Sequence, residues 1–240
     1  MGRAFEFRKA RKLKRWSAMA KTFTRIGKEL SMAVKDSGPN PETNSKLRAV
    51  IQNAKAVNMP KDNIERAIKK ASEIKSDNYK EILFEGYGPK GVAIIIETAS
   101  DNNNRTVANI RSYFNKFEGN LGTSGSVEFL FDRLCCFSIK TDLNINDLEF
   151  ELIDYGLEEV LKDKNNDQYL LYSLFDYFGI IQKELEKREI KIISSEFERI
   201  PRQYKLLKKN DFNIVNELLE LIDEDDDVQN IYHNMQLYQE

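Results

Sequence analysis

Apolar positions in the first third of the chain recur every three or four residues, which is the spacing of helices that bury one face. "WSAMAKTFTRIGKELSMAVK" shows this spacing from residue 16 to 35, and "SKLRAVIQNAKAVN" repeats it after a break at "DSGPNPETN". Pro60 suits the first turn of a third helix, "PKDNIERAIKKAS". We therefore predict a basic helical domain over residues 1–76, formed by a three-helix bundle with its basic side chains on the outer faces.

From residue 80 the pattern changes to alternation and short apolar runs, which are typical of strands. "KEILFEGYG" and "GVAIIIETA" predict a hairpin around "GPKG", and "GSVEFLF" predicts a further strand at residues 125–131. Between them, "DNNNRTVANIRSYFNKFEG" predicts a helix capped by Asp101 or Asn102 and ended by Gly119. Its inner residues are expected to be Val107, Ile110, Phe114 and Phe117.

Residues 134–200 follow the order β-α-β-β-α-β, which is the order of a ferredoxin-like sandwich. Its strands are "LCCFSIK", "LEEVLK", "QYLLYSL" and "KIISSEFERI", and its helices are "INDLEFELIDYG" and "DYFGIIQKELEKREI". The remaining "DFNIVNELLELIDE" and "DVQNIYHNM" supply a helix and a strand that residues 80–133 lack. We predict an α+β fold in which residues 80–133 and 207–240 form a middle domain and residues 134–200 form a third domain inserted into it.

Charge is divided unevenly along the chain. The formal net charge is −2, yet residues 1–76 hold 19 Lys/Arg and 7 Asp/Glu, whereas the remainder holds 18 and 32. The first thirty residues alone hold ten Lys/Arg and two acidic residues. A split of this size suggests that one part of the chain binds a partner of the opposite sign.

Several long segments resemble the YebC family. They are "AVNMPKDNIERAIKKAS", "FEGYGPKGVAIIIE", "NRTVANIRSYFNKFEGNLGTSGSVEFLFD" and "EDDDVQNIYHNM". The resemblance implies a helical N-terminal domain, two α+β domains, a bacterial or organellar setting, and regulation of gene expression rather than catalysis. Members are described as DNA-binding transcriptional regulators, and others as translation factors that act at the ribosome on proline-rich sequences; both roles stay open here.

The N-terminus departs from one pattern of that family. Many members begin with a Gly-His-Ser-Lys-Trp motif, whereas this chain begins "MGRAFEFRKARKLKRW". Gly2 and the basic character are retained, so the chain resembles a subgroup with this alternative opening. Any role tied to the motif's histidine is in doubt for this chain.

Four interpretations of the basic start compete: a targeting peptide, a membrane-surface helix, a nucleic-acid arm and a solvated helix face. The segment continues into the first helix without a cleavage-like gap, and residues 2–15 offer only Phe5, Phe7 and Leu13 as large apolar side chains. Nucleic acid fits best, because each Lys or Arg on a phosphate releases counterions and interleaved aromatic rings can stack on bases. For Trp16 alone, packing in the bundle core is favoured.

The candidate nucleic-acid-binding residues share a basic or aromatic side chain and a place in the helical domain. They are Arg3, Arg8, Lys9, Arg11, Lys12, Lys14, Arg15, Trp16, Lys21, Lys61, Arg66, Lys69 and Lys70. In the second cluster, Asp62 with Arg66 and Glu65 with Lys69 have the i,i+4 spacing that also supports a helix by itself. The partner is DNA or ribosomal RNA, with the ribosome as a candidate assembly, and the lack of a helix-turn-helix pattern tilts the interpretation towards RNA.

No motif predicts catalysis, a metal site or a cofactor. His233 is the single histidine, and adjacent Cys135 and Cys136 lie in an apolar run that predicts a buried strand in a reducing compartment. "GNLGTSGS" has neither the dinucleotide nor the P-loop spacing and predicts a turn, although its N–H groups could hold a phosphate. "DEDDD" predicts a solvated acidic loop.

The chain shows no apolar run of membrane-spanning length and no secretory signal. We expect a cytoplasmic, non-enzymatic protein that makes no membrane contact. The competing hypothesis is a scaffold whose acidic α+β domains bind a basic protein, and an enzyme ranks third.

Overall fold

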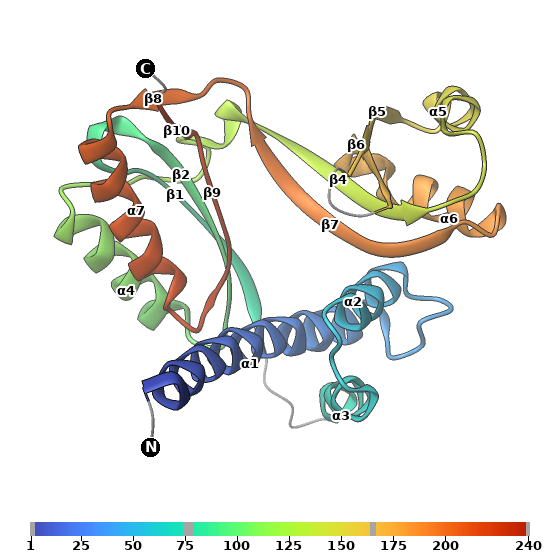
Figure 1. Cartoon of the computed structure of the whole chain (residues 1–240), viewed down its shortest axis with the longest axis horizontal. Coiled ribbons are helices and arrows are strands. Elements are labelled where there is room, and N and C mark those ends of the chain that lie inside the picture. The colour runs from blue at the N-terminus through green and yellow to red at the C-terminus, as the bar shows by residue number, and fades with distance from the viewer. Residues whose placement is uncertain (1–2, 74–78, 164–166, 239–240) are drawn as a thin grey trace. The chain divides into compact units, whose positions relative to one another are not determined.

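The computed structural model describes residues 3–73, 79–163 and 167–238, and it describes side chains from residue 19 onwards. The chain divides into two compact units, Met1–Tyr79 and Lys80–Glu240, and each is described by itself. The first is helical and the second is built on antiparallel sheets, so the fold is α+β as expected (Figure 1). The domain boundaries drawn from the sequence stay a prediction.

In the described part of the first unit, α1 (Arg3–Ser37), α2 (Ser45–Ala56) and α3 (Lys61–Ser72) surround one apolar core. That core includes Ile26, Leu30, Leu47, Val50 and Ile64. The first helix begins at Arg3 and not near residue 16, because residues 3–15 contain no Gly or Pro and are rich in good helix formers. Pro60 is the N-cap residue of α3, one position before the expected first turn.

Asn44 fixes the connection between α1 and α2. Its side-chain oxygen accepts the N–H of Leu47 at 2.9 Å, which caps α2. Its amide nitrogen donates to the carbonyl oxygens of Ala33 and Gly38 at 2.7 and 2.9 Å, which lie at the end of α1. Asn44 is only 2% exposed, so one buried amide satisfies backbone groups of both helix ends.

The first sheet of the second unit has the strand order β3-β1-β2-β9. These strands are β1 (Lys80–Tyr87), β2 (Ala93–Ser100), β3 (Asn120–Leu121) and β9 (Val228–His233), and every pair is antiparallel. The short helical turn η1 (Pro89–Gly91) connects β1 to β2. Helices α4 (Asn103–Lys116) and α7 (Lys209–Asp223) lie side by side on one face of this sheet (Figure 1).

The predicted helix over residues 101–119 is confirmed in its cap and its inner face. Asn102 accepts the N–H of Arg105 at 3.2 Å. Ile110 and Phe114 are fully buried, while Val107 and Phe117 pack against the same core. The predicted strand at residues 125–131 is wrong: η2 (Glu128–Leu130) is a 3-10 turn, and β4 (Phe131–Lys140) begins after it.

The second sheet has the order β5-β6-β4-β7, which is the order of a ferredoxin-like sheet. It contains β5 (Leu157–Lys162), β6 (Tyr169–Leu174) and β7 (Lys191–Pro201) beside β4, with antiparallel pairing throughout. Helices α5 (Ile145–Ile153) and α6 (Phe178–Lys187) pack on it, and η3 (Phe175–Tyr177) precedes α6. The predicted order of elements over residues 134–200 is therefore observed.

A small parallel ribbon completes the unit. Strand β8 (Lys205–Leu207) follows the second sheet, and β10 (Met235–Leu237) follows β9. The two pair with Met235 opposite Lys205 and Leu237 opposite Leu207. Leu207 and Met235 belong to the core beneath α4 and α7, which attaches the ribbon to the first sheet.

Candidate nucleic-acid interface

The N-terminal half of α1 carries most of the predicted contacts. Residues 3–18 are helical, but their side chains lie outside the described part of the chain. This concerns Arg3, Arg8, Lys9, Arg11, Lys12, Lys14, Arg15 and Trp16. The structure shows only that these positions belong to one continuous helix. Their role in binding nucleic acid stays a prediction.

In the half of α1 whose side chains are described, some of the basic side chains are partly or fully buried. Lys21 is half-buried, and Lys28 is 8% exposed. The Nζ of Lys28 lies 5.2 Å from the centre of the Tyr79 ring, a cation–π distance. Because Lys21 is half-buried, it is a weaker candidate for a phosphate contact than the exposed lysines of α3.

Helix α3 presents the second predicted cluster. Ile64 and Ala71 are buried and Ala67 and Ile68 pack against the bundle core, so the opposite side of the helix faces solvent. The exposed residues of that side include all four predicted contacts: Lys61, Arg66, Lys69 and Lys70.

Local partners weaken this cluster as an anion site. Lys61 Nζ lies 3.4 Å from Glu65 Oε1. Arg66 donates to the carbonyl oxygen of Asp62 at 3.2 Å and to Oδ1 of Asn63 at 2.5 Å. Asp62 and Glu65 also line a shallow depression of about 400 Å³ together with Arg66 and Lys69. The two carboxylates there offset the two cations.

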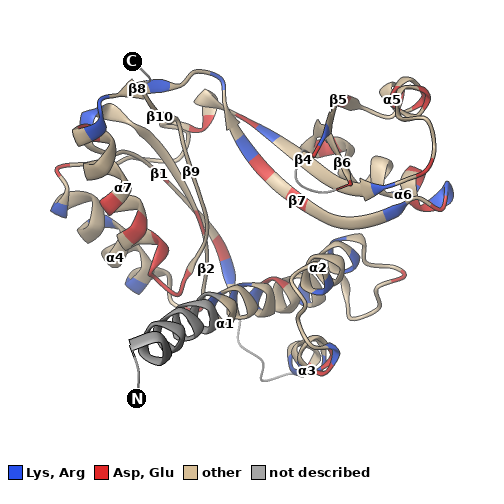
Figure 2. Cartoon of the chain, in the orientation of Figure 1, with Lys and Arg blue, Asp and Glu red and all other residues tan. Residues whose placement is uncertain are grey.

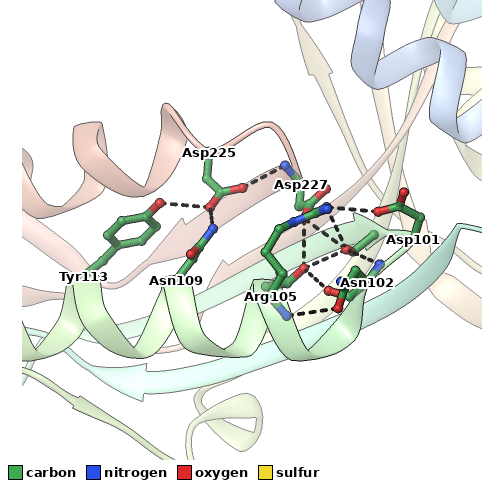
Figure 3. Close-up of polar contacts among 9 residues, drawn as sticks. Asp101, Asn102, Arg105, Asn109, Tyr113, Asp225 and Asp227 are labelled. Atoms are coloured by element: carbon green, nitrogen blue, oxygen red, sulfur yellow. Dashed lines mark hydrogen bonds and ion pairs between the residues drawn. The ribbon is translucent and has the colours of Figure 1, made fainter.

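The acidic loop at residues 223–227 is only partly solvated, which corrects the expectation from sequence: Glu224 and Asp226 are exposed, but Asp225 and Asp227 contact α4. Asp227 is 4% exposed, and its Oδ2 accepts from Ser100, Arg105 and Thr106 at 3.0, 2.7 and 2.9 Å (Figure 3). Arg105 also pairs with Asp101 at 3.0 Å, and these two carboxylates raise the pKa of its guanidinium. Arg105 thus ties the start of α4 to the loop before β9.

Asp225 makes the second half of that contact. Its Oδ2 accepts from Asn109 at 3.0 Å and from the Tyr113 hydroxyl at 2.9 Å, both on α4 (Figure 3). Burial, together with this carboxylate, raises the pKa of Tyr113 to about 12. Asp225 and Asp227 therefore hold this loop against α4.

The glycine-rich turn binds an anion that the chain itself supplies. The N–H groups of Gly125, Val127 and Glu128 donate to the Glu85 carboxylate at 2.6, 2.8 and 2.8 Å. Burial acts to raise the pKa of Glu85, but these hydrogen bonds outweigh it and hold that pKa below its usual value. Glu85 occupies the donors that a phosphate would need, and it also explains why residues 125–128 do not form a strand.

Cys135 and Cys136 are buried in β4, and His233 is half-buried in β9. Burial raises the pKa of the Cys135 thiol to about 11 and that of Cys136 to about 12, and it lowers the pKa of His233. In the described ranges, no three His, Cys, Asp or Glu side chains are placed to hold a metal ion. Among the described helices, none is long and apolar enough to cross a bilayer.

Sequence reasoning missed one exposed basic and aromatic surface in the second unit. Around the ribbon of β8 and β10, Tyr204, Leu206 and Tyr238 are each more than half exposed, and Lys205, Lys208 and Lys209 are exposed beside them. The signal that could have found it is the absence of acidic residues from 199–210 and 228–239, in a unit that is otherwise acidic.

Two family models match the chain. The model of the TACO1/YebC protein N-terminal domain matches residues 3–74, and the model of the TACO1/YebC second and third domain matches residues 79–235.

Similar proteins cover almost the whole length. A "probable transcriptional regulatory protein" of Flavobacterium johnsoniae is 65% identical over 236 residues, covering 98% of this chain and 99% of the relative. A protein of the same name from Parabacteroides distasonis is 55% identical over 237 residues, covering 98% and 97%. The crystal structure of a conserved hypothetical protein from Aquifex aeolicus has a TM-score of 0.76 at 33% identity and covers 92% of this chain and 91% of its own. This chain therefore belongs to the TACO1/YebC family.

Proposed function

We propose that the protein is a non-catalytic regulator of gene expression that binds nucleic acid through its helical N-terminal domain. The observation that carries the proposal is the concentration of positive charge, with 19 Lys/Arg against 7 Asp/Glu in residues 1–76 of a chain whose net charge is −2. Contacts between such side chains and phosphates release counterions, which makes binding strong at low salt and weak at high salt.

The continuation of α1 to Arg3 adds a geometric reason. Helix positions three, four and seven residues apart share one face, so positions 8, 11, 12 and 15 follow one stripe along α1. These positions hold Arg8, Arg11, Lys12 and Arg15. Basic residues at four positions of one helix stripe could contact neighbouring phosphates of one nucleic-acid strand.

Within this proposal we favour ribosomal RNA as the target and a translation role at proline-rich sequences as the function. The helical domain lacks a helix-turn-helix pattern, and the rest of the chain, with 18 basic and 32 acidic residues, would be repelled by a duplex wrapped around it. The names of the relatives point instead to transcription, so a DNA-binding regulator is the second candidate.

The scaffold alternative has less support than the charge count suggests. Asp225, Asp227 and Glu85 are engaged with donors of their own unit and are not available to a basic partner. Glu97 and Glu128 both pair with Arg199.

The first test measures affinity against salt concentration. The full chain and the variant Arg8→Gln/Arg11→Gln/Lys12→Gln/Arg15→Gln are titrated with fluorescent ribosomal RNA fragments and with duplex DNA. Removing four phosphate contacts should lower the slope of log affinity against log salt by about 3, at roughly 0.7 for each contact to a single strand. A matched control is Lys116→Gln/Lys183→Gln/Lys187→Gln/Lys191→Gln, which removes four exposed cations from the second unit.

An unchanged slope in the α1 variant would refute the proposed interface. Crosslinking in cells, followed by sequencing of the attached nucleic acid, decides between the two targets. Crosslinks on ribosomal RNA support the translation role, whereas crosslinks confined to promoters assign the protein to transcription.

A further inference from the structure

An acid-free surface stands out in the acidic second unit. Residues 199–210, "RIPRQYKLLKKN", and 228–239, "VQNIYHNMQLYQ", contain no Asp or Glu. The fold brings these two segments together as the parallel pair β8 and β10. Hydrogen bonds extend the pairing at both ends, from Lys205 N–H to the Asn234 oxygen at 2.7 Å and from Tyr238 N–H to the Leu207 oxygen at 2.8 Å.

The two faces of this β8–β10 ribbon differ. Leu207 and Met235 are 5% and 6% exposed and pack into the core. Because side chains alternate along a strand, the neighbouring positions belong to the outer face. That face holds Tyr204, Leu206, Lys208, Gln236 and Tyr238, of which Tyr204, Leu206 and Tyr238 are 55%, 57% and 55% exposed.

Lys208 on this face and Lys209, the first residue of α7, add positive charge beside the exposed rings. Lys205, Lys208 and Lys209 make no ion pair with any residue that the structure describes, whereas Arg202 pairs with Asp132 at 2.8 Å and Lys90 pairs with Asp211 at 3.4 Å. Figure 2 shows the basic residues along β8 and at the adjoining end of α7, away from the acidic end of that helix.

Helix stability does not explain these lysines. Lys208 is the N-cap residue of α7 and Lys209 its first residue, and no side chain caps the helix there. Cations at a helix N-terminus oppose the helix dipole, which favours acids at that end. Their placement is unfavourable for the helix by itself and favourable for a polyanion that lies across the ribbon.

We propose that the outer face of the β8–β10 ribbon binds single-stranded RNA by stacking unpaired bases on Tyr204 and Tyr238, with Lys208 and Lys209 contacting the backbone phosphates. Tyr204 and Tyr238 lie four ladder positions apart, about 13 Å at 3.3 Å per residue, so they bind different bases. Exposed rings on a sheet face, combined with lysines, are the features that recognise unpaired bases, whereas a duplex hides its base faces.

This inference rests on the proposed function, because it adds a second contact for the RNA that the helical domain binds. The two sites are separable, since the ribbon belongs to the other unit of the chain. A substitution on the β8–β10 ribbon leaves the basic residues of α1 unchanged, and a substitution in α1 leaves the ribbon unchanged.

The experiment uses the full chain and a fluorescent twelve-nucleotide oligouridylate, with the same sequence as single-stranded DNA and a duplex RNA as further arms. Tyr204→Ala/Tyr238→Ala should bind the oligouridylate at least about 30-fold more weakly, because two stacked bases are lost and each usually contributes about 5-fold or more. Tyr204→Phe/Tyr238→Phe keeps both rings and should bind like the wild type. Lys208→Gln/Lys209→Gln should lower the salt slope by about 1.4.

Matched controls test for a general loss of charge or apolar surface. Phe150→Ala removes a ring that is 78% exposed on α5. Lys183→Gln/Lys191→Gln removes two exposed lysines, one on α6 and one on β7. Both should leave the affinity unchanged. Because Tyr204 and Tyr238 are exposed, their variants should keep the wild-type circular dichroism spectrum.

A direct readout is photocrosslinking with 4-thiouridine in the same oligonucleotide, followed by mass spectrometry. Crosslinks at Tyr204 or Tyr238 support the proposal even if the α1 variant binds normally, in which case only the helical interface fails. Wild-type affinity of the alanine variant, with crosslinks confined to residues 1–76, overturns the ribbon site and leaves the helical interface standing. Equal loss for duplex RNA also overturns it, because stacking requires unpaired bases.

Discussion

Arg199 on β7 donates from Nε to Oε1 of Glu97 on β2 at 3.1 Å, which joins the two sheets of the second unit. Its Nη1 donates to Glu128 Oε1 at 2.9 Å, and the side chain is 6% exposed. Burial alone would lower the pKa of Arg199, but the hydrogen bonds to the two carboxylates raise it. The Arg199 guanidinium therefore stays charged where it connects the two sheets.

Replacing Arg199 with Met should destabilise the second unit by about 2 kcal/mol. Loss of one partner from a buried ion pair leaves the other charge uncompensated, and partial exposure of Glu97 and Glu128 reduces that cost. Urea unfolding followed by circular dichroism measures the change. Arg202→Met is the control, because its pair with Asp132 is exposed and should contribute less than about 1 kcal/mol.

The Glu85 carboxylate should make the second unit sensitive to acid. Its pKa in the folded chain lies below the ordinary 4.5, so it stabilises the fold above pH 4.5 and loses that contribution as pH falls through the lower folded value. Glu85→Gln should lower stability at pH 7 and flatten the fall of melting temperature between pH 5 and pH 3 (approximate bounds set by that shift). If Glu217→Gln, at an exposed position of α7, flattened the curve equally, the assignment to Glu85 would fail.

The two cysteines should resist alkylation in the native protein. Their raised pKa values, about 11 for Cys135 and about 12 for Cys136, leave a thiolate fraction of roughly one in a thousand or less at pH 8. Mass spectrometry after iodoacetamide treatment should find neither thiol modified in buffer and both modified in denaturant. Rapid labelling of the folded chain would contradict the burial.

Asp227→Asn should be more damaging than Asp101→Asn. The first change removes a buried carboxylate that accepts from Ser100, Arg105 and Thr106, and we expect a loss of about 3 kcal/mol. The second removes only the exposed partner of the same guanidinium, at less than about 1 kcal/mol. Hydrogen exchange of the α4 backbone amides measures where the stability is lost. Equal protection of these amides in the two variants would contradict the larger role of Asp227.

Local patterns predicted most of the secondary structure. "LEEVLK" matches β5 from Leu157 to Lys162, and Asn102 caps α4 as expected, because these features depend on neighbours in sequence. The order of strands in residues 134–200 followed from the alternation of strand and helix patterns.

The sequence-based predictions are wrong where contacts with residues distant in sequence determine the local structure. Gly125 and Val127 look like the start of a strand, but Glu85, some forty residues earlier, takes their N–H groups. Asp225 and Asp227 look solvated until α4 supplies Tyr113 and Arg105. Tyr204 and Tyr238 share a surface only after β8 pairs with β10, so no local window in the sequence reveals them together.

The pairing of β9 with β2 also sets the order in which the chain can mature during synthesis. Residues 94–98 of β2 pair with β1 on one side, but they receive their partners on the other side only when residues 228–233 have emerged, after the whole second sheet. Until then the nascent chain carries an unpaired strand edge, which is the feature that promotes aggregation. The strand pairs of the second sheet are all internal to residues 131–201, so this sheet can form before β9 pairs with β2. Chaperone binding to β2 should therefore end when the last strands leave the exit tunnel.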